Sequence, residues 1–389
     1  MRFSILVITI YLLLGVDSVQ KEPTQANNED FDIPVIDLAD EELTEQELID
    51  KIKNACSEYG FFQVTSTGIS EALIKEYRKQ CKLYFSLPHE VKRQWKRNER
   101  NARGFFDDEL TKQRRDWKEA LDMGVPGSRD WSVPDDDPSN LCLDGWNQLP
   151  SEEILPNFRS VVTSYFDACA ELSHRLAVLM AKGLNLDASA PIIRSLREQH
   201  SSYLRSNFYP PCREKSKDGK KPLGISPHKD AGFLTVLLQD DDCHSLQVLK
   251  DGKWITVHPI PGALTINTGD MAEVWSNGKY TAPLHRVLSN DSLERYSAPF
   301  FYNPSYNQIV EPLGNNPLFH PVLWGYFRAV RFAGDMTDLG LEIQTEDFEK
   351  SQDSKHLRIQ EEFAAEADFK MPFSVEKYRS VLSPQGKDI

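Results

Sequence analysis

Two histidines and one aspartate have the residue types and spacing to hold a transition metal. His228 and Asp230 stand two residues apart, and His285 follows much later in the chain. If residues 228–230 lie on a β-strand, His228 and Asp230 both point inward, because alternate side chains share a face. Two imidazoles and one carboxylate form the facial triad that binds Fe(II) and leaves coordination positions open. An HxD pair alone is weak support, because a surface histidine near an unrelated aspartate is the commoner arrangement.

A second group of polar residues has the chemistry to bind a carboxylate near that metal. Arg295 and Ser297 are two residues apart on a predicted strand, and so are Asn207 and Tyr209. A guanidinium fork and a hydroxyl on one strand face can bind a carboxylate in a bidentate manner, and a phenol can donate to the same group. The presence of both groups favours the metal interpretation over a chance HxD pair.

Together these residues resemble the 2-oxoglutarate-dependent Fe(II) dioxygenases of the isopenicillin N synthase-like group. The resemblance rests on residues 207–211 (Asn-Phe-Tyr-Pro-Pro), the HxD, the later histidine and the Arg-x-Ser. Connecting segments agree with it, namely residues 33–38, 59–64, 116–119, 246–248, 251–254, 267–270 and 276–280. The similarity extends from about residue 31 to about residue 346, which is most of the chain.

The resemblance implies a role for each motif residue. Three residues are expected to ligate Fe(II): His228, Asp230 and His285. Four residues are expected to bind the co-substrate 2-oxoglutarate: Tyr209, Arg295, Ser297 and Asn207. O2 would then drive decarboxylation of 2-oxoglutarate to succinate and CO2, coupled to hydroxylation, desaturation or ring closure of a small molecule of specialised metabolism. Ascorbate is an expected reductant.

The hydrophobic pattern predicts the elements that position these residues. Between residues 201 and 303, short β-rich runs alternate with turn signals, which is typical of a sandwich or barrel. Helical spacing covers residues 41–57, 70–87 and 158–184, with short strands at 33–38 and 61–64. Residues 89–157 are predicted to form long loops with short helices. We therefore expect an α+β protein with a double-stranded β-helix (jelly-roll) core that is buttressed by N- and C-terminal helices.

The chain divides into five expected segments. They are a signal peptide (1–18), a disordered linker (19–30), a helix-rich region (31–200), the Fe(II)/2-oxoglutarate jelly-roll core (201–305) and C-terminal helices with a tail (306–389). The signal peptide is predicted from a short basic start, an apolar run and small residues at Val16 and Ser18. It indicates the secretory pathway or an ER-derived lumen, and without a genuine leader the chain would be cytoplasmic. An apolar tail packed on the domain is the alternative.

Composition excludes several classes of partner. The 389 residues include 45 Lys and Arg against 59 Asp and Glu, a net charge of −14, which argues against nucleic acid or an anionic membrane surface. The N-terminal apolar run is short for a stable membrane span. Six cysteines without a CxxC pair are expected to be free thiols, and their even number leaves disulfides as the alternative if the chain is secreted. We expect a monomer that binds a small-molecule substrate.

The substrate site is less sharply defined than the metal site. Five residues are candidates to line it: Arg205, Phe233, Trp275, Phe301 and Arg103. Arg205 shares strand parity with Asn207, so it either faces the pocket and binds an acidic or amino-acid-like substrate or forms a structural ion pair. Core packing is the expected role of two of the three aromatic residues. Residues 103–106 are a candidate lid.

Three functions remain open at this point. The first is a 2-oxoglutarate-dependent oxygenase, and the second is an iron oxidase of the same fold that does not use 2-oxoglutarate. The third is a non-catalytic β-sandwich binding protein with a vestigial site. Retention of Tyr209, Arg295 and Ser297 together with the triad favours the first.

Overall fold

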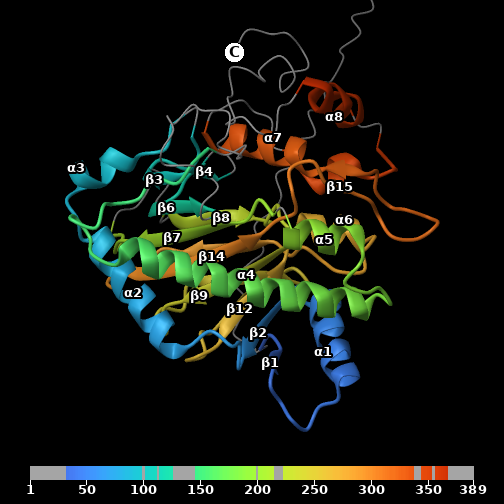
Figure 1. Ribbon diagram of the computed structural model, residues 1–389, viewed down its shortest axis with the longest axis horizontal. Helices are drawn as coiled ribbons and strands as arrows, with labels where there is room; N and C mark the ends of the chain where they lie inside the picture. The colour runs from blue at the N-terminus through green and yellow to red at the C-terminus, as the bar shows by residue number, and fades with distance from the viewer. Residues whose placement is uncertain are drawn as a thin grey trace, which may run out of the picture.

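Two facing β-sheets form the centre of the molecule, and helices cover them from outside (Figure 1). The computed structural model describes residues 32–98, 101–111, 114–125, 145–198, 200–213, 222–336, 343–352 and 355–366. The predicted signal peptide (1–18) and linker (19–30) lie outside the described residues, so both stay predictions. No helix within the described ranges combines the length and the apolarity that a membrane crossing requires.

The larger sheet has eight strands. Their order is β1 (Val35–Asp37), β2 (Phe61–Thr65), β12 (Leu264–Thr268), β9 (Leu234–Gln239), β14 (Arg295–Tyr302), β7 (Tyr203–Tyr209), β6 (Glu119–Gly124) and β3 (Gly104–Phe106). β1 and β2 are parallel, and the other neighbours are antiparallel. Because β1, β2, β3 and β6 precede residue 200, the N-terminal region contributes half of this sheet.

The smaller sheet is antiparallel and has four strands. Their order is β11 (Lys253–Thr256), β10 (Leu246–Lys250), β13 (His285–Leu288) and β8 (Leu223–His228). Two short hairpins lie apart from both sheets and pair β4 (Leu110–Thr111) with β5 (Arg114–Arg115) and β15 (Ile309–Val310) with β16 (Val322–Leu323). This arrangement agrees with the expected jelly-roll core.

Helices buttress the outer face of the larger sheet. The long helix α4 (Phe158–Gly183) crosses this face, with α1 (Glu45–Glu58), α2 (Glu71–Phe85) and α5 (Pro191–Glu198) around it (Figure 1). α7 (Trp324–Met336) and α8 (Lys355–Glu366) lie at the opposite end of the view from α1 (Figure 1). α1 begins at a capping box in which Thr44 and Glu47 each bond the other's backbone N–H. Shorter helices are α3 (His89–Lys92), α6 (Asp270–Trp275) and the 3₁₀ turns Arg93–Trp95 and Thr345–Phe348.

Successive side chains of β14 point alternately to the helix-covered face of the larger sheet and to the cavity between the two sheets. Phe300 faces the helices, where its ring meets Phe166 of α4 edge-on at 4.9 Å between centroids. Arg295, Ser297 and Phe301 line the cavity on the other face. Since side chains alternate along a strand, the apolar contacts of one face hold the polar residues of the other in place.

Residues 89–157 differ from the prediction of loops with short helices. Four strands, β3 to β6, lie within residues 104–124, and β6 and β3 extend the larger sheet. The sequence of β6, Glu-Ala-Leu-Asp-Met-Gly, has no β-branched residue, so propensity argues against a strand. Pairing with β7 overrides it, because Asp122 stands directly opposite Arg205. The lid expected at residues 103–106 is wrong, since Phe105 and Phe106 are buried in β3.

Candidate active site

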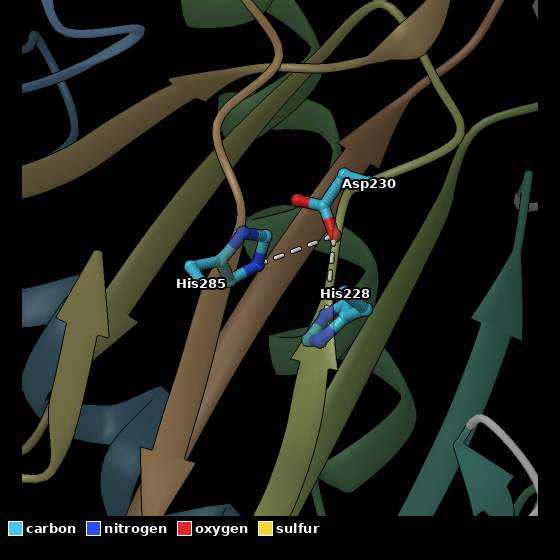
Figure 2. Close-up of side chains that lie close together, drawn as sticks. All are labelled: His228, Asp230 and His285. Carbon is cyan, nitrogen blue, oxygen red and sulfur yellow. Dashed lines mark ion pairs between the residues drawn. The ribbon is translucent and has the colours of Figure 1, made fainter. Parts of the chain in front are cut away.

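His228, Asp230 and His285 converge on one point at the edge of the smaller sheet (Figure 2). His228 ends β8, His285 begins β13, and the two are cross-strand partners. The Oδ1 atom of Asp230 lies 3.6 Å from Nε2 of each histidine, and all three ligand atoms lie within 4.8 Å of one another. Asp230 reaches this point from the loop after β8, so the prediction that His228 and Asp230 share a strand is wrong.

Backbone carbonyls orient both imidazoles. Nδ1 of His228 lies 2.8 Å from the carbonyl oxygen of Ser226, and Nδ1 of His285 lies 3.1 Å from that of Pro283. A carbonyl oxygen only accepts, so Nδ1 carries the proton in each ring and donates it. The lone pair of Nε2 is thereby left for a metal, as in most histidine ligands.

Asp230 is oriented by two further side chains. Its Oδ2 accepts from Thr235 Oγ1 at 2.6 Å and from Asn267 Nδ2 at 2.8 Å, which leaves Oδ1 for the metal position. Burial alone would raise the pKa of Asp230, but the nearby histidines and the bond from Asn267 hold that pKa well below its ordinary value. Burial lowers the pKa of His228 to about 3. Burial alone would also lower the pKa of His285, but the Asp230 carboxylate raises that pKa above its ordinary value, so a cation must displace any proton on its Nε2. An ionised carboxylate beside a neutral imidazole is the protonation state that a divalent cation requires.

An inner cavity runs from this triad to Arg295, between the two sheets. Arg295 is 2% exposed, and Tyr209, its cross-strand partner, places a ring 4.9 Å from the guanidinium carbon. Nη2 donates to Gln239 Oε1 at 3.3 Å, whereas Nε and Nη1 have no hydrogen-bond partner among the described residues. Asn207 Nδ2 donates to Ser297 Oγ at 3.3 Å. Buried N–H groups are rarely left unpaired, so the guanidinium is suited to an anionic ligand.

A second, outer cavity lies beyond His228 and Asp230. Five cationic side chains line it: Lys118, Arg205, Lys229, Arg328 and Arg331. The amide oxygens of Asn207 and Asn303 also lie on its wall, are buried, and have no hydrogen-bond partner in the described part of the chain. Lys118, Arg205, Lys229 and Arg331 each form an ion pair with a carboxylate, so the lining offers paired cations together with acceptor atoms beside the metal position.

Arg205 is fully engaged in a buried ion network at this wall. Its Nε and Nη2 each donate to Asp122 at 2.8 Å, and its Nη1 donates to Glu109 at 2.9 Å. Glu109 also pairs with Lys118 at 2.6 Å and Arg97 at 3.6 Å. Of the two roles left open for Arg205, the structure shows the ion pair, and all three of its nitrogens already have partners.

We expect Glu109→Gln to lower the free energy of unfolding by about 3 kcal/mol, because the change leaves buried cations short of their partner. Burial alone would raise the pKa of Glu109, but Arg205, Lys118 and Arg97 hold that pKa well below its ordinary value. The loss should therefore be full near neutral pH and shrink as the pH falls below the ordinary glutamate value.

Urea unfolding at several pH values measures this loss. Glu171→Gln is the matched control, because the Arg197–Glu171 pair is exposed on both sides and should contribute less than about 1 kcal/mol. Equal losses in the two variants would contradict a stabilising role of the buried network.

The other candidate substrate-lining residues lie in different parts of the structure. Phe301 lines both cavities and stacks on Tyr203 at 4.6 Å. Phe233 and Trp275 lie 5.4 Å apart in the hydrophobic core and line neither cavity, so the structure gives these two candidates the core-packing role expected for two of the three aromatic residues. Arg103 is buried behind Tyr203, with its guanidinium 4.8 Å from that ring, and is absent from both cavity walls.

Several site residues were not predicted from the sequence. They are Thr235 and Asn267 at Asp230, Gln239 at Arg295, and Arg328 and Arg331 on the outer wall. A signal existed for Thr235 and Gln239, because they are the polar residues of β9, a strand that is otherwise apolar. The two arginines are spaced i, i+3 on α7 and so share a helix face.

Comparison with known proteins identifies the family. The sequence model of the 2OG-Fe(II) oxygenase superfamily matches residues 200–304, and that of the non-haem dioxygenase in morphine synthesis N-terminal region matches residues 33–152. Jasmonate-induced oxygenase 2 of Arabidopsis thaliana is 31% identical over 80% of this chain and 81% of its own length. Homoarginine-6-hydroxylase 2-ODD-C23 of Glycine max is 32% identical over 72% of this chain and 88% of its own.

Solved structures agree with the sequence relatives. The crystal structure of JOX2 in complex with 2OG, Fe and JA has a TM-score of 0.65 and 28% identity, and the match covers 84% of this chain and 88% of that one. The dioxygenase for auxin oxidation in rice has a TM-score of 0.58 over 80% of this chain and 99% of that one, and at 24% identity it supports the jelly-roll fold alone. The chain therefore belongs to the 2OG-Fe(II) oxygenase superfamily and is a 2-oxoglutarate-dependent Fe(II) dioxygenase.

Proposed function

We propose that His228, Asp230 and His285 hold the catalytic iron and that this dioxygenase oxidises an acidic or amino-acid-like small molecule. The convergence of the three ligand atoms within 4.8 Å carries the first part of the proposal. Bound Fe(II) supplies O2 activation coupled to decarboxylation of 2-oxoglutarate to succinate and CO2. The residues of this chain bind, orient and separate the two organic reactants around that metal.

The co-substrate is assigned to the inner cavity. Arg295 offers two unpartnered nitrogens there, and Ser297 and Tyr209 stand beside it. In the proposed arrangement the distal carboxylate accepts from Arg295, Ser297 and Tyr209. Asn207 Nδ2 donates to the Ser297 hydroxyl oxygen, which leaves the hydroxyl proton for the carboxylate. The ketoacid end then reaches the metal position, since the same cavity touches His228, Asp230 and His285.

The substrate is assigned to the outer cavity. Arg328 and Arg331 lie on its wall, and in our proposal they take the place of Arg205 as the partners of a substrate carboxylate. Arg331 would share its guanidinium between the substrate and Asp270, to which its Nη2 donates at 3.0 Å. The buried amide oxygens of Asn303 and Asn207 are unpartnered acceptors, which suits a substrate that also carries an amine or hydroxyl. Together these groups favour an amino acid or hydroxy acid over a purely apolar acid.

The metal and co-substrate assignments are tested by anaerobic visible spectroscopy of the Fe(II)-loaded protein. Titration with 2-oxoglutarate should produce a metal-to-ligand charge-transfer band that saturates near one equivalent of iron per chain. Protein loaded with Zn(II) is the control and should give no band, because Zn(II) has a filled d shell. If the protein binds iron but gives no band, the result would favour the alternative function, an iron oxidase of the same fold that does not use 2-oxoglutarate.

The substrate class is tested by succinate release with paired compounds. Each carboxylic acid is offered beside its methyl ester, and each amino acid beside its deaminated analogue. We expect the acid and the amino acid to stimulate release about tenfold more than their partners, because each lost charge-assisted bond costs about 1.5–3 kcal/mol. If the methyl esters stimulate succinate release as much as the acids do, the proposal of an acidic substrate is wrong.

The N-terminal leader and the monomeric state are also proposed from the sequence. The basic start, the apolar run and the small residues at 16 and 18 support cleavage after Ser18. Expression of the full chain in a secreting eukaryotic cell, followed by N-terminal sequencing and gel filtration, tests both. A chain that keeps Met1 and stays in the cytoplasm would contradict secretion.

A further inference from the structure

Gln239 links the expected co-substrate anchor to the rest of the larger sheet. It is the last residue of β9, and its cross-strand partner on β14 is Ser297. Its side chain is buried, with 5% of the residue exposed, and it lies between Arg295 and Thr265. No motif of the sequence analysis included it.

We propose that Gln239 is a positioning residue that orients the Arg295 guanidinium for 2-oxoglutarate without neutralising its charge. The proposal rests on the assignment of Arg295 as the anchor of the distal carboxylate. Arg295 itself contacts the co-substrate in that assignment, and Gln239 acts through Arg295.

The orientation of the Gln239 amide follows from the chemistry of its neighbours. Arg295 Nη2 can only donate, so the atom that faces it at 3.3 Å must be the amide oxygen. The amide nitrogen then points away and donates to Thr265 Oγ1 at 3.1 Å. Thr265 lies on β12 and is itself buried. The amide is therefore held at both ends and presents a fixed acceptor to the guanidinium.

The backbone at Gln239 is held by the N-terminal region. Arg78 of α2 donates from Nη2 to the carbonyl oxygen of Gln239 at 2.6 Å. The same guanidinium binds the Asp241 carboxylate through both Nη atoms, at 3.0 and 2.9 Å. These contacts hold the end of β9 in place and so fix the backbone position of Gln239.

The charge of Arg295 explains why an amide suits this position. In the described part of the chain no carboxylate forms an ion pair with Arg295. The neighbouring Asp240 is turned away and accepts from the backbone N–H of Tyr296 at 2.6 Å. Gln239 occupies one donor of Nη2 and leaves Nε and Nη1 unpartnered, so the full positive charge remains for an incoming carboxylate. A carboxylate at position 239 would compete with the co-substrate for it.

Two variants separate the charge from the acceptor. Gln239→Glu keeps the shape and adds a charge, and Gln239→Met removes the acceptor at similar length. Two probes separate the anchor from the metal: 2-oxoglutarate, and 2-oxopentanoate, which has the same ketoacid end and length but no distal carboxylate. Dissociation constants are measured for both from the charge-transfer band of the anaerobic Fe(II) protein.

We expect Gln239→Glu to weaken 2-oxoglutarate binding about tenfold or more and Gln239→Met to weaken it roughly threefold. Binding of 2-oxopentanoate should change less than about twofold in both, because this probe has no distal carboxylate for Arg295 to bind. Thr265→Val leaves Gln239 in place but frees one end of its amide, and should give a smaller loss for 2-oxoglutarate alone. If the Gln239 variants do not fold, the dissociation constants of Thr265→Val for the two probes test the proposal instead.

The outcomes distinguish this inference from the proposed function. If the wild type gives no band with either probe, the assignment of the iron and co-substrate sites is wrong. If the wild type binds 2-oxoglutarate but the variants weaken both probes equally, Gln239 acts on the fold or the metal, and the positioning role is wrong. Unchanged 2-oxoglutarate binding in Gln239→Glu overturns it as well.

Discussion

Replacing Asp230 with alanine is expected to abolish stoichiometric iron binding and to lower succinate release by roughly three orders of magnitude. Asp230 is the only carboxylate of the triad, and its Oδ1 lies 3.6 Å from both imidazole nitrogens. Without it, two neutral imidazoles remain for a hard divalent cation. Iron content after desalting and succinate release measure the two effects.

Matched variants separate ligation from orientation. Thr235→Val and Asn267→Leu each remove one hydrogen bond to Asp230 Oδ2 and leave the ligand in place. Loss of such an orienting bond is expected to weaken metal binding about 10- to 100-fold. Both should therefore recover activity at high Fe(II), which Asp230→Ala should not. Full iron content and turnover in Asp230→Ala would show that the catalytic metal binds at another site.

The metal triad could be predicted from the sequence because its members are close to strands with clear patterns. β7, β9, β13 and β14 all lie within the β-rich region expected between residues 201 and 303. Strand alternation is a local property, so spacing alone predicts that Arg295 and Ser297 share a face of β14 and that Asn207 and Tyr209 share a face of β7. The HxD pair also meets at the site, but not by strand alternation, because Asp230 reaches it from the loop after β8.

The outer cavity could not be predicted in the same way, because long-range pairing shapes it. The role of Arg205 depends on Asp122 and Glu109, which precede it by 83 and 96 residues. Their segment lacks the propensity of a strand, and only its register against β7 places them. Phe233 and Trp275 show the converse, since an aromatic side chain packs in a core or lines a cavity according to its neighbours in space.

Arg328 and Arg331 also show why the substrate wall needs a structure. They follow the last motif of the iron site and come from α7, a helix that no motif connects to the metal. Iron and co-substrate residues come from strands of the jelly roll and the loop after β8, whereas the substrate wall combines those strands with β4 and α7. The same iron chemistry can thus serve different substrates when the added elements change.

Removal of the Arg295 guanidinium should affect the co-substrate and spare the metal. Arg295→Met is expected to raise the KM for 2-oxoglutarate about 100-fold, because truncating one partner of a buried charge pair costs about 2–5 kcal/mol. Arg295→Lys keeps the charge but loses the planar fork, so a rise of about tenfold is expected. Iron content should stay at one per chain in both, since Arg295 lies outside the triad.

The discriminating control is again 2-oxopentanoate, which has no distal carboxylate for Arg295 to bind. Wild type and Arg295→Met should bind it with similar dissociation constants, so the preference for 2-oxoglutarate over this probe should collapse in the variant. An unchanged KM for 2-oxoglutarate would assign the distal carboxylate to other cations, among which those of the outer cavity are the nearest alternative. In that case the inner cavity would lose its assigned ligand, although the triad would still stand. The two arginine variants therefore test whether the buried, unpartnered nitrogens of Arg295 have the function that their burial implies.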